Sequence, residues 1–379
     1  MLLVMTSRLV TELPLGSLCL LPSDRAGWHE FGSAKAIEMP SPSFLGGAGG
    51  LDLFTRFAGR TMTMPAHGCA VLTDAYAYGD GLAFIDDHLL LEPSVTASPI
   101  DIGAWGFFRD VGPLDGGKRR IDNWSEHPHR LGEAVLLARR SDFVYGHWLL
   151  ETLPRVRLAL RLCSDQAAFV VSASIADYQI EMLEQLGVAR ERLFPLNPGT
   201  AVHCDRLIVP SLAHWSSNVV HDFACETYDT LIADCIARTG QGRAHDRILV
   251  TRSSRKRDPR PLFNLAEVES VTRRHGFVTI DPGAVPWWEQ IAIFAQASTV
   301  VGLSGSGLHN TVYTGDRSHV LVLQPNHSRN FLQTSIAAIR HHRISYLFGE
   351  SLSAFDRDGS ECGYVIDVDL LDHILPTIV

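Results

Sequence analysis

Apolar and polar positions change their pattern near residue 134, and the part of the chain after it has a regular arrangement. Residues 168–173 (AFVVSA) form a short apolar run that predicts a buried strand, whereas residues 175–188 (IADYQIEMLEQLGV) carry apolar side chains at helical spacing up to Gly187. Strands that alternate with helices in this way indicate βαβ units with right-handed connections. The other elements expected here are strands over 134–139 and 206–210 and helices over 143–162 and 219–238.

A glycine-rich, charged stretch at residues 239–246 (TGQGRAHD) marks a boundary, after which the alternation begins again. By contrast, the first 130 residues are rich in Gly, Pro and Ser, and only 69–78 and 81–92 look like hairpin strands. The elements expected after the boundary are strands over 247–252, 277–281, 299–305, 319–325 and 344–348, and helices over 264–276, 286–297, a short segment after 305, and 329–341.

These patterns predict an α/β fold with two Rossmann-like domains, whose parallel sheets face one another across a cleft, and an irregular, β-rich N-terminal segment. Ligands of open α/β sheets bind at the carboxyl ends of the strands, so functional side chains are expected in the loops that follow strands. The predicted boundaries are 1–130 for the N-terminal segment, 131–240 and 241–350 for the two domains, and 351–379 for a tail that returns to the first domain.

Composition and charge exclude several classes of protein for this chain. Hydrophobic residues make up 46% of the 379 residues and charged residues 20%, which excludes a disordered chain or a coiled coil. The formal net charge of −9 gives no general attraction to nucleic acid. The seven cysteines contain no CxxC pair, which argues against a zinc site or a disulfide framework. Because neither a secretory signal nor a membrane-spanning segment is recognisable, a cytoplasmic protein is expected, with peripheral association at the inner face of the membrane left open.

The first candidate site is the glycine-rich junction at residues 300–310 (VVGLSGSGLHN). Glycines allow close approach of the backbone to a ligand, and a helix that starts after a strand favours an anion at its first residues. The segment satisfies neither the dinucleotide fingerprint nor the P-loop nor the nucleophile elbow, so either a phosphate cradle or a plain tight turn explains it. The candidate ligand contacts are Ser304, Gly305, Ser306, Gly307 and Asn310.

The second candidate site is the basic loop at residues 251–260 (TRSSRKRDPR), which follows the expected strand 247–250. Arginine binds phosphate through two parallel hydrogen bonds and keeps its charge, so Arg252, Arg255 and Arg257 are candidates for binding a diphosphate. The alternative is a solvated basic loop without a ligand.

Two further pairs are candidates on helices. His147 and Glu151 are four residues apart, so they share one helix face and can act as a base and its orienting partner, or form a plain hydrogen bond. Glu289 and Gln290 start the helix expected over 286–297, where Glu289 either complements the helix dipole or contacts a sugar.

Taken in order, these segments resemble the family 61 glycosyltransferases, which include plant xylan-modifying enzymes, protein O-linked N-acetylglucosamine transferases and many bacterial polysaccharide-assembly enzymes. The family pattern of His-x3-acid before Leu-Pro, an Arg after a strand, a Glu-Gln pair and a Gly-x-His-Gly-Ala-Gly-x-x-Asn loop is matched over about residues 134–345. The sequence departs from it in three ways, because Ser304 replaces the usual His, Ser306 the usual Ala, and Glu151 the commoner Asp.

The resemblance implies a GT-B architecture in which residues 131–240 bind the acceptor and residues 241–350 bind a nucleotide sugar, with the N-terminal segment on the acceptor side. It implies inverting transfer of a sugar from a nucleotide-diphosphate sugar, for which a UDP-sugar is the expected donor. The implied acceptor is a glycan or lipid-linked glycan in cell-surface polysaccharide biosynthesis. No cofactor and no metal are expected, Glu151 is the expected base, and His147 orients it or bonds the acceptor. A GT-A enzyme would require Asp-x-Asp at a strand end, and Asp367-Val368-Asp369 lies in the C-terminal tail.

Two alternatives remain at this point. The replacement of the family histidine by Ser304 is compatible with a nucleotide-sugar-binding protein that has no activity. A serine hydrolase that uses Ser304 or Ser306 with His309 is the third reading.

Overall fold

The computed structural model divides the chain into two compact units. Unit 1 comprises Met1–Lys35 and Pro65–Ser216, and unit 2 comprises Ala36–Met64 and Ser217–Val379. The chain therefore enters unit 2, returns to unit 1, and enters unit 2 again. The residues that the structure describes are 5–14, 21–46, 59–79, 81–91, 111–113, 118–125, 128–139, 141–215, 219–239, 245–252, 260–326, 328, 330–352 and 363–379.

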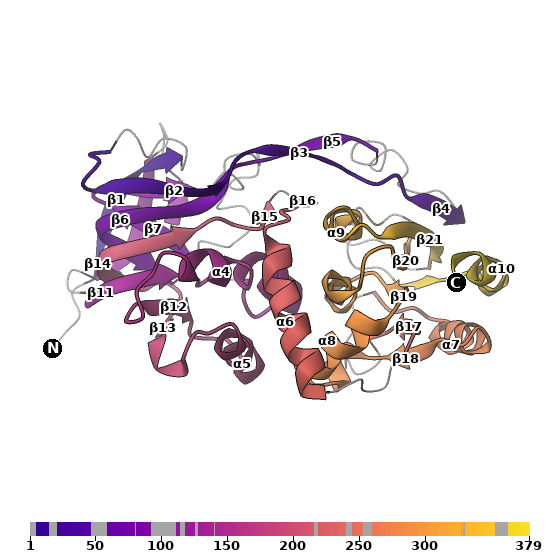
Figure 1. Cartoon of the computed structure of the whole chain (residues 1–379). Coiled ribbons are helices and arrows are strands. Elements are labelled where there is room, and N and C mark those ends of the chain that lie inside the picture. The colour runs from indigo at the N-terminus through magenta and orange to yellow at the C-terminus, as the bar shows by residue number, and fades with distance from the viewer. Residues whose placement is uncertain are drawn as a thin grey trace. The chain divides into compact units, whose positions relative to one another are not determined.

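Unit 1 contains one large mixed sheet (Figure 1). Its strands are β1 (Met5–Pro14), β2 (Ala26–Gly32), β6 (His67–Tyr78), β7 (Leu82–Ile85), β8 (His88–Leu91), β9 (Val111–Pro113), β10 (Lys118–Ser125), β11 (His129–Leu136), β12 (Ala168–Ser172), β13 (Leu193–Leu196) and β14 (Ala201–Pro210). They follow the order β13-β12-β11-β14-β6-β7-β8-β1-β10-β9, and β2 pairs with β6. The part from β13 to β14 is parallel, whereas β6 runs antiparallel to β14, β2 and β7.

The parallel part of this sheet reverses its order between β11 and β14. From β11 the chain moves outward to β12 and β13, and then crosses back to place β14 on the other side of β11. Loops that follow the two strands at such a reversal diverge and leave room for a ligand. The remaining elements of unit 1 are α3 (Tyr145–His147), the π-helix η3 (Trp148–Thr152), α4 (Arg155–Leu160), α5 (Asp177–Gln185), η4 (Arg190–Arg192) and β15 (His214–Trp215).

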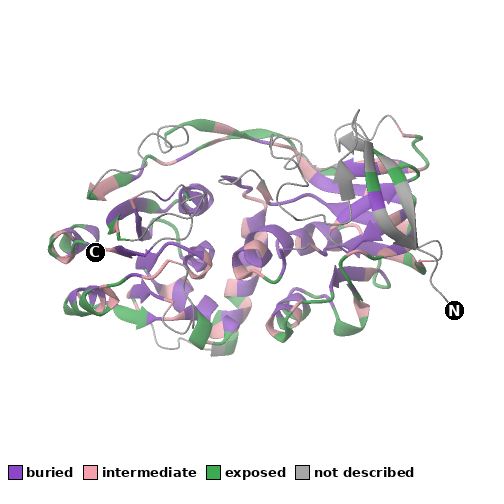
Figure 2. Cartoon of the chain, turned by 180° about the vertical axis from the view of Figure 1, so that it is seen from behind, coloured by how far each residue is buried: buried purple, intermediate pink, exposed green. Residues whose placement is uncertain are grey.

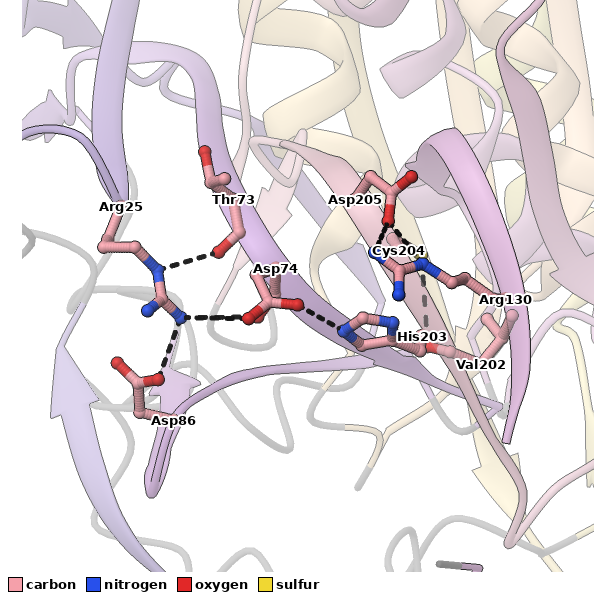
Figure 3. A network of polar contacts seen from close by, with 9 residues as sticks. All are labelled: Arg25, Thr73, Asp74, Asp86, Arg130, Val202, His203, Cys204 and Asp205. Carbon is pink, nitrogen blue, oxygen red and sulfur yellow. Dashed lines mark hydrogen bonds and ion pairs between the residues drawn. The ribbon is translucent and has the colours of Figure 1, made fainter. Parts of the chain in front are cut away.

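A polar network connects the strands of this sheet at the point where the pairing partner of β6 changes from β2 to β7 (Figure 3). Arg25 donates from Nε to the carbonyl of Thr73, and its Nη2 lies 2.8 Å from Asp86 Oδ1 and 3.8 Å from Asp74 Oδ2. Asp74 has a φ of +56°, which is uncommon for a residue other than glycine, and it lies between the β2-paired and β7-paired parts of β6. His203 Nε2 lies 2.7 Å from Asp74 Oδ1 and joins β14 to this network.

Unit 2 contains a sheet that is parallel except for one short edge strand. Its strands are β4 (Ser43–Gly46), β17 (Arg247–Val250), β18 (Val278–Ile280), β19 (Thr299–Leu303), β20 (His319–Pro325), β21 (Arg343–Ser351) and the antiparallel β22 (Tyr364–Val365). The order is β18-β17-β19-β20-β21, and β4 and β22 both pair with β21. This order reverses between β17 and β19, which predicts the ligand position in unit 2 by the same rule.

Helices cover both faces of the unit 2 sheet (Figure 1). One layer contains α6 (Ala224–Thr239), α8 (Trp287–Gln296), the 3₁₀-helix η6 (Ser306–Tyr313) and α9 (Leu332–Arg340). The other layer contains α7 (Leu265–Arg274) and α10 (Val368–Ile378), whose apolar side chains form a core with the sheet. Strands β19 and β20, between the layers, are buried along their whole length (Figure 2). The short elements β3 (Lys35–Glu38), β5 (Thr61–Met64), β16 (Val219–Val220) and η5 (Pro282–Ala284) complete the part of the chain that the structure describes.

The predicted alternation of strands and helices is confirmed as a mixed α/β fold with two sheets. Two helices differ from the prediction, because the segment 143–162 is broken into short pieces and the helix expected from 219 begins at Ala224. The division between the units falls at residue 216 rather than near 240, since α6 packs on α8 and η6 of unit 2. The segment 351–379 was expected to return to the first domain, but α10 lies on α7 in unit 2.

None of the helices in the described ranges has the length and apolar composition that a membrane span requires.

Two buried histidines predict that unit 2 is sensitive to acid. Burial lowers the pKa of His319 and of His342 to about 4, and neighbouring arginines act in the same direction. The unfolded chain therefore takes up these protons first as the pH falls below about 6.5, so each histidine removes up to ~3 kcal/mol of stability between pH 6.5 and 4. Urea unfolding across this range is expected to show a smaller loss for His319→Gln than for the wild type.

The matched control for this experiment is His373→Gln, since His373 is exposed on α10. Because other groups titrate in the same range, the difference between the two variants is the readout. Identical pH dependence of His319→Gln and His373→Gln would contradict the prediction.

Candidate functional site

Glu151 is the centre of a polar cluster at the reversal point of the unit 1 sheet. Its Oε1 lies 2.5 Å from His147 Nδ1 and 3.2 Å from His214 Nδ1. Its Oε2 lies 3.1 Å from Arg139 Nε. Arg139 follows β11 and His214 follows β14, the two strands between which the order reverses. The strand order therefore assembles the cluster from residues that are far apart in the sequence.

The helix that carries Glu151 is widened into a π-turn at this residue. The amide of Leu153 donates to the carbonyl of Trp148, five residues earlier, at 2.9 Å. Pro154 has no amide hydrogen to continue the α-helical pattern, and α4 begins directly after it. Single π-turns of this kind are frequent at functional sites.

Asp142 connects the π-turn to the loop of Arg139. Its Oδ1 accepts a hydrogen bond from Thr152 Oγ1 at 2.5 Å, and its Oδ2 accepts one from the backbone amide of Arg139 at 2.8 Å. Burial raises the pKa of Asp142 to about 6, although these hydrogen bonds act against the shift. The side chain therefore holds two segments of the cluster at fixed positions.

The surroundings of Glu151 keep this carboxylate ionised. Burial disfavours the charge, but the guanidinium of Arg139 and the hydrogen bonds of His147 and His214 outweigh burial and hold the pKa of Glu151 well below its usual range. A carboxylate with so low a proton affinity is a weak general base at neutral pH. It is well suited to orient an imidazole and to stabilise its protonated form.

Accessibility separates the two members of the predicted pair. The side chain of Glu151 is 8% exposed, whereas that of His147 is 41% exposed. With Nδ1 directed at Glu151, His147 has Nε2 as the nitrogen for a substrate proton. The geometry thus favours His147 as the group that meets a substrate.

The second cluster lies at the reversal point of the unit 2 sheet and contains two arginines and a glycine. A Cβ atom on Gly305 would lie 3.0 Å from Arg252 Nη1 and 3.5 Å from Arg260 Nη2. Gly305 has φ +152° and ψ −179°, a conformation that is essentially restricted to glycine. Arg252 also donates from Nη2 to the carbonyl of Arg260 at 3.0 Å. Two guanidinium groups are therefore held against the backbone just before η6.

This arrangement can bind an anion with more than one phosphate. Guanidinium groups form charge-assisted hydrogen bonds with phosphate oxygens, and the first amides of a helix add a partial positive charge. Ser306 and Gly307, both half-buried, supply the first residues of η6. Ser304 is buried, and its amide donates to the carbonyl of Leu323 at 2.9 Å.

Gln290 and Asn310 are buried and bonded within the protein. Gln290 Nε2 donates to the carbonyls of Pro282 and Val285, both at 2.7 Å, and its Oε1 accepts from Asn310 Nδ2 at 2.9 Å. These contacts fix the loop after β18 to α8 and η6. The two residues therefore support the walls of the candidate site, which sequence spacing alone did not indicate.

The remaining predicted residues are Glu289, Arg255 and Arg257. Glu289 is half-buried in the first turn of α8. Arg255 and Arg257 lie outside the described residues. The described ranges contain no group of three or more His, Cys, Asp or Glu side chains that could hold a metal ion.

Sequence analysis missed Arg139, His214 and Arg260. Arg139 and His214 each follow an apolar strand, the same signal that selected Arg252, but neither has a candidate partner in its own stretch of sequence. Arg260 was recognised only as part of the basic loop. Their roles depend on which strands are neighbours.

Comparison with known proteins gives one family. Residues 145–321 match the family model described as Glycosyltransferase 61. This range begins just before His147 and contains Glu151, Arg252, Gln290 and the glycine-rich turn at Gly305. A search of the curated proteins found no match.

Proposed function

Residues 145–321 belong to the glycosyltransferase 61 family, whose membership implies sugar transfer from a donor to an acceptor, and from this premise we propose a specific reaction. The enzyme transfers a sugar from a nucleotide-diphosphate sugar to a hydroxyl of a glycan acceptor and inverts the anomeric carbon. The expected donor is a UDP-sugar. The pathway is cell-surface polysaccharide biosynthesis at the cytoplasmic side of the membrane. One observation carries the proposal: each unit has a cluster at the reversal point of its sheet, one suited to proton transfer and one to a diphosphate.

His147 is the general base in this proposal, and Glu151 is its orienting partner. The sequence favoured the opposite assignment, because family members have an acid at the position of Glu151. The burial of Glu151, its low pKa and its contact with Arg139 support the exchange of roles. His214 bonds the same carboxylate oxygen as His147 and helps to fix its position.

The reaction is a single displacement. The acceptor oxygen forms a bond to the anomeric carbon while the bond from that carbon to the diphosphate oxygen breaks on the opposite face. The proton of the acceptor hydroxyl passes to His147 Nε2, and Glu151 stabilises the imidazolium that results. The diphosphate leaves with its negative charge, which Arg252, Arg260 and the first amides of η6 stabilise. A GT-B arrangement, in which the two units face one another across a cleft, is part of the proposal.

Donor turnover and product stereochemistry test this function together. We expect slow hydrolysis of at least one UDP-sugar in a panel, and NMR should show that the released sugar first appears with the anomeric configuration opposite to that of the donor. A binding protein without activity would bind UDP and hydrolyse none of the panel. A serine hydrolase would instead be labelled by a fluorophosphonate probe.

We also expect activity without a divalent cation. The arginines beside Gly305 can stabilise the leaving diphosphate, which is the role that a metal ion has in other transferases. Donor hydrolysis is expected to retain most of its rate in EDTA. Abolition of the rate by EDTA and its recovery with Mn²⁺ would overturn this part of the proposal.

A further inference from the structure

We propose that Phe143, Tyr145 and Tyr178 form a subsite that binds the acceptor through the face of a pyranose ring. This inference rests on the proposed function, and it adds the residues that hold a sugar ring of the acceptor. The three side chains are called the aromatic patch below.

The aromatic patch lies in the segments that follow β11 and β12, at the same edge of the sheet as the Glu151 cluster, with Phe143 in a loop, Tyr145 at the start of α3 and Tyr178 in the first turn of α5. Phe143, four residues before His147, is 69% exposed. Large apolar side chains are more often buried than exposed. Tyr145 begins the helix that carries His147, and its ring lies 6.3 Å from that of Tyr178 at an interplanar angle of 48°. Both tyrosines are half-buried. A pair of contacting tyrosines thus begins two residues before His147 along the chain, and Phe143 is exposed in the loop just before them.

Hydrogen bonds fix the patch relative to His147. Gln179 Nε2 donates to the carbonyl of Asp142 at 2.8 Å, and Gln179 Oε1 accepts from the amide of Ala176 at 2.7 Å. The start of α5 is thereby tied to the residue before Phe143. Asp142 in turn bonds Thr152 in the π-turn. A ring bound on the patch would therefore keep a constant position relative to His147, which a transfer reaction requires.

The chemistry of the patch fits a sugar better than a lipid chain. One face of a pyranose presents C–H groups that pack on aromatic rings, and its hydroxyls require polar groups at the rim. Ser174 is an exposed polar side chain four residues before Tyr178, and its Oγ lies 2.9 Å from that of the buried Ser172. A lipid chain would require a longer apolar surface without these hydroxyls.

Saturation-transfer NMR with a panel of methyl pyranosides, recorded in the presence of UDP, tests the inference. The panel contains the glucoside, galactoside, mannoside, xyloside and N-acetylglucosaminide. We expect at least one of them to bind the wild type, and Phe143→Ala/Tyr178→Ala to weaken that binding at least about ten-fold. Tyr178→Phe, which keeps the ring, should retain most of the affinity. Phe263→Ala is the matched control, because Phe263 is 59% exposed in unit 2, and it should bind like the wild type.

The outcomes separate this inference from the proposed function. Absence of binding by the wild type to every pyranoside, or equal binding by the wild type and the double variant, overturns the sugar subsite. Calorimetry with UDP tests the donor site separately, since failure of the wild type to bind UDP would overturn the proposed function whatever the pyranosides show. Circular dichroism melting of each variant establishes that it is folded.

Discussion

Replacement of His147 by alanine is expected to reduce sugar transfer by about 10²–10⁴-fold, the usual contribution of a positioned general base. The acceptor hydroxyl then has no group to take its proton, while Glu151 stays bonded to His214 and paired with Arg139. Because the arginines of the donor site lie in the other unit, UDP affinity should be unaffected. The measurement is the transfer rate at saturating donor, with UDP affinity determined by calorimetry.

Two further observations distinguish a base from a structural residue. Added imidazole should restore part of the rate of His147→Ala, because a small base can occupy the space that the side chain leaves. Glu151→Gln should retain more activity than His147→Ala, since it keeps the base and loses only the negative neighbour that stabilises the imidazolium. Complete loss of activity in Glu151→Gln, with substantial activity in His147→Ala, would restore Glu151 as the base.

Replacement of Arg252 by alanine is expected to weaken UDP binding by about ten-fold or more, since a charged hydrogen bond is worth ~1.5–3 kcal/mol. Arg260→Ala should have a similar effect, because both guanidinium groups lie against Gly305. Calorimetric titration of each variant with UDP provides the measurement.

The control for the arginine variants is Arg247→Ala. Arg247 begins β17 and Arg252 follows it, so the two arginines lie at opposite ends of one strand. Arg247 donates to the carbonyl of His275, away from the reversal point. An equal loss of UDP affinity in Arg247→Ala and Arg252→Ala would point to a general effect of positive charge, and an unchanged affinity in Arg252→Ala would remove this residue from the site.

Local patterns in the sequence predicted most of the parallel strands, because buried strands are short apolar runs whose composition is independent of their neighbours. The predicted strands around Val170 and Val301 are found at these places. The same patterns did not predict the π-turn, since His147 and Glu151 have the spacing of an ordinary α-helix and the break depends on Asp142 and Pro154.

The candidate site was predicted in part for a related reason. A residue after a strand can be recognised locally, as Arg252 was, but its partners depend on the order of the strands in the sheet. Arg139 and His214 meet at Glu151 only because β14 returns to the side of β11. Gln290 and Asn310 were predicted as ligand contacts from local motifs, whereas their hydrogen bond to one another joins α8 to η6 and depends on the packing of these helices.

The early excursion of residues 36–64 into unit 2 determines the order in which the chain can fold during synthesis. Strand β4 pairs with β21 over residues 345–348, so its partner leaves the ribosome only after some 300 further residues have been made. The early segment must therefore wait without its partner while unit 1 forms. A fragment that begins at residue 217 would lack β4 and leave the backbone of β21 uncovered, an edge at which two such fragments can associate.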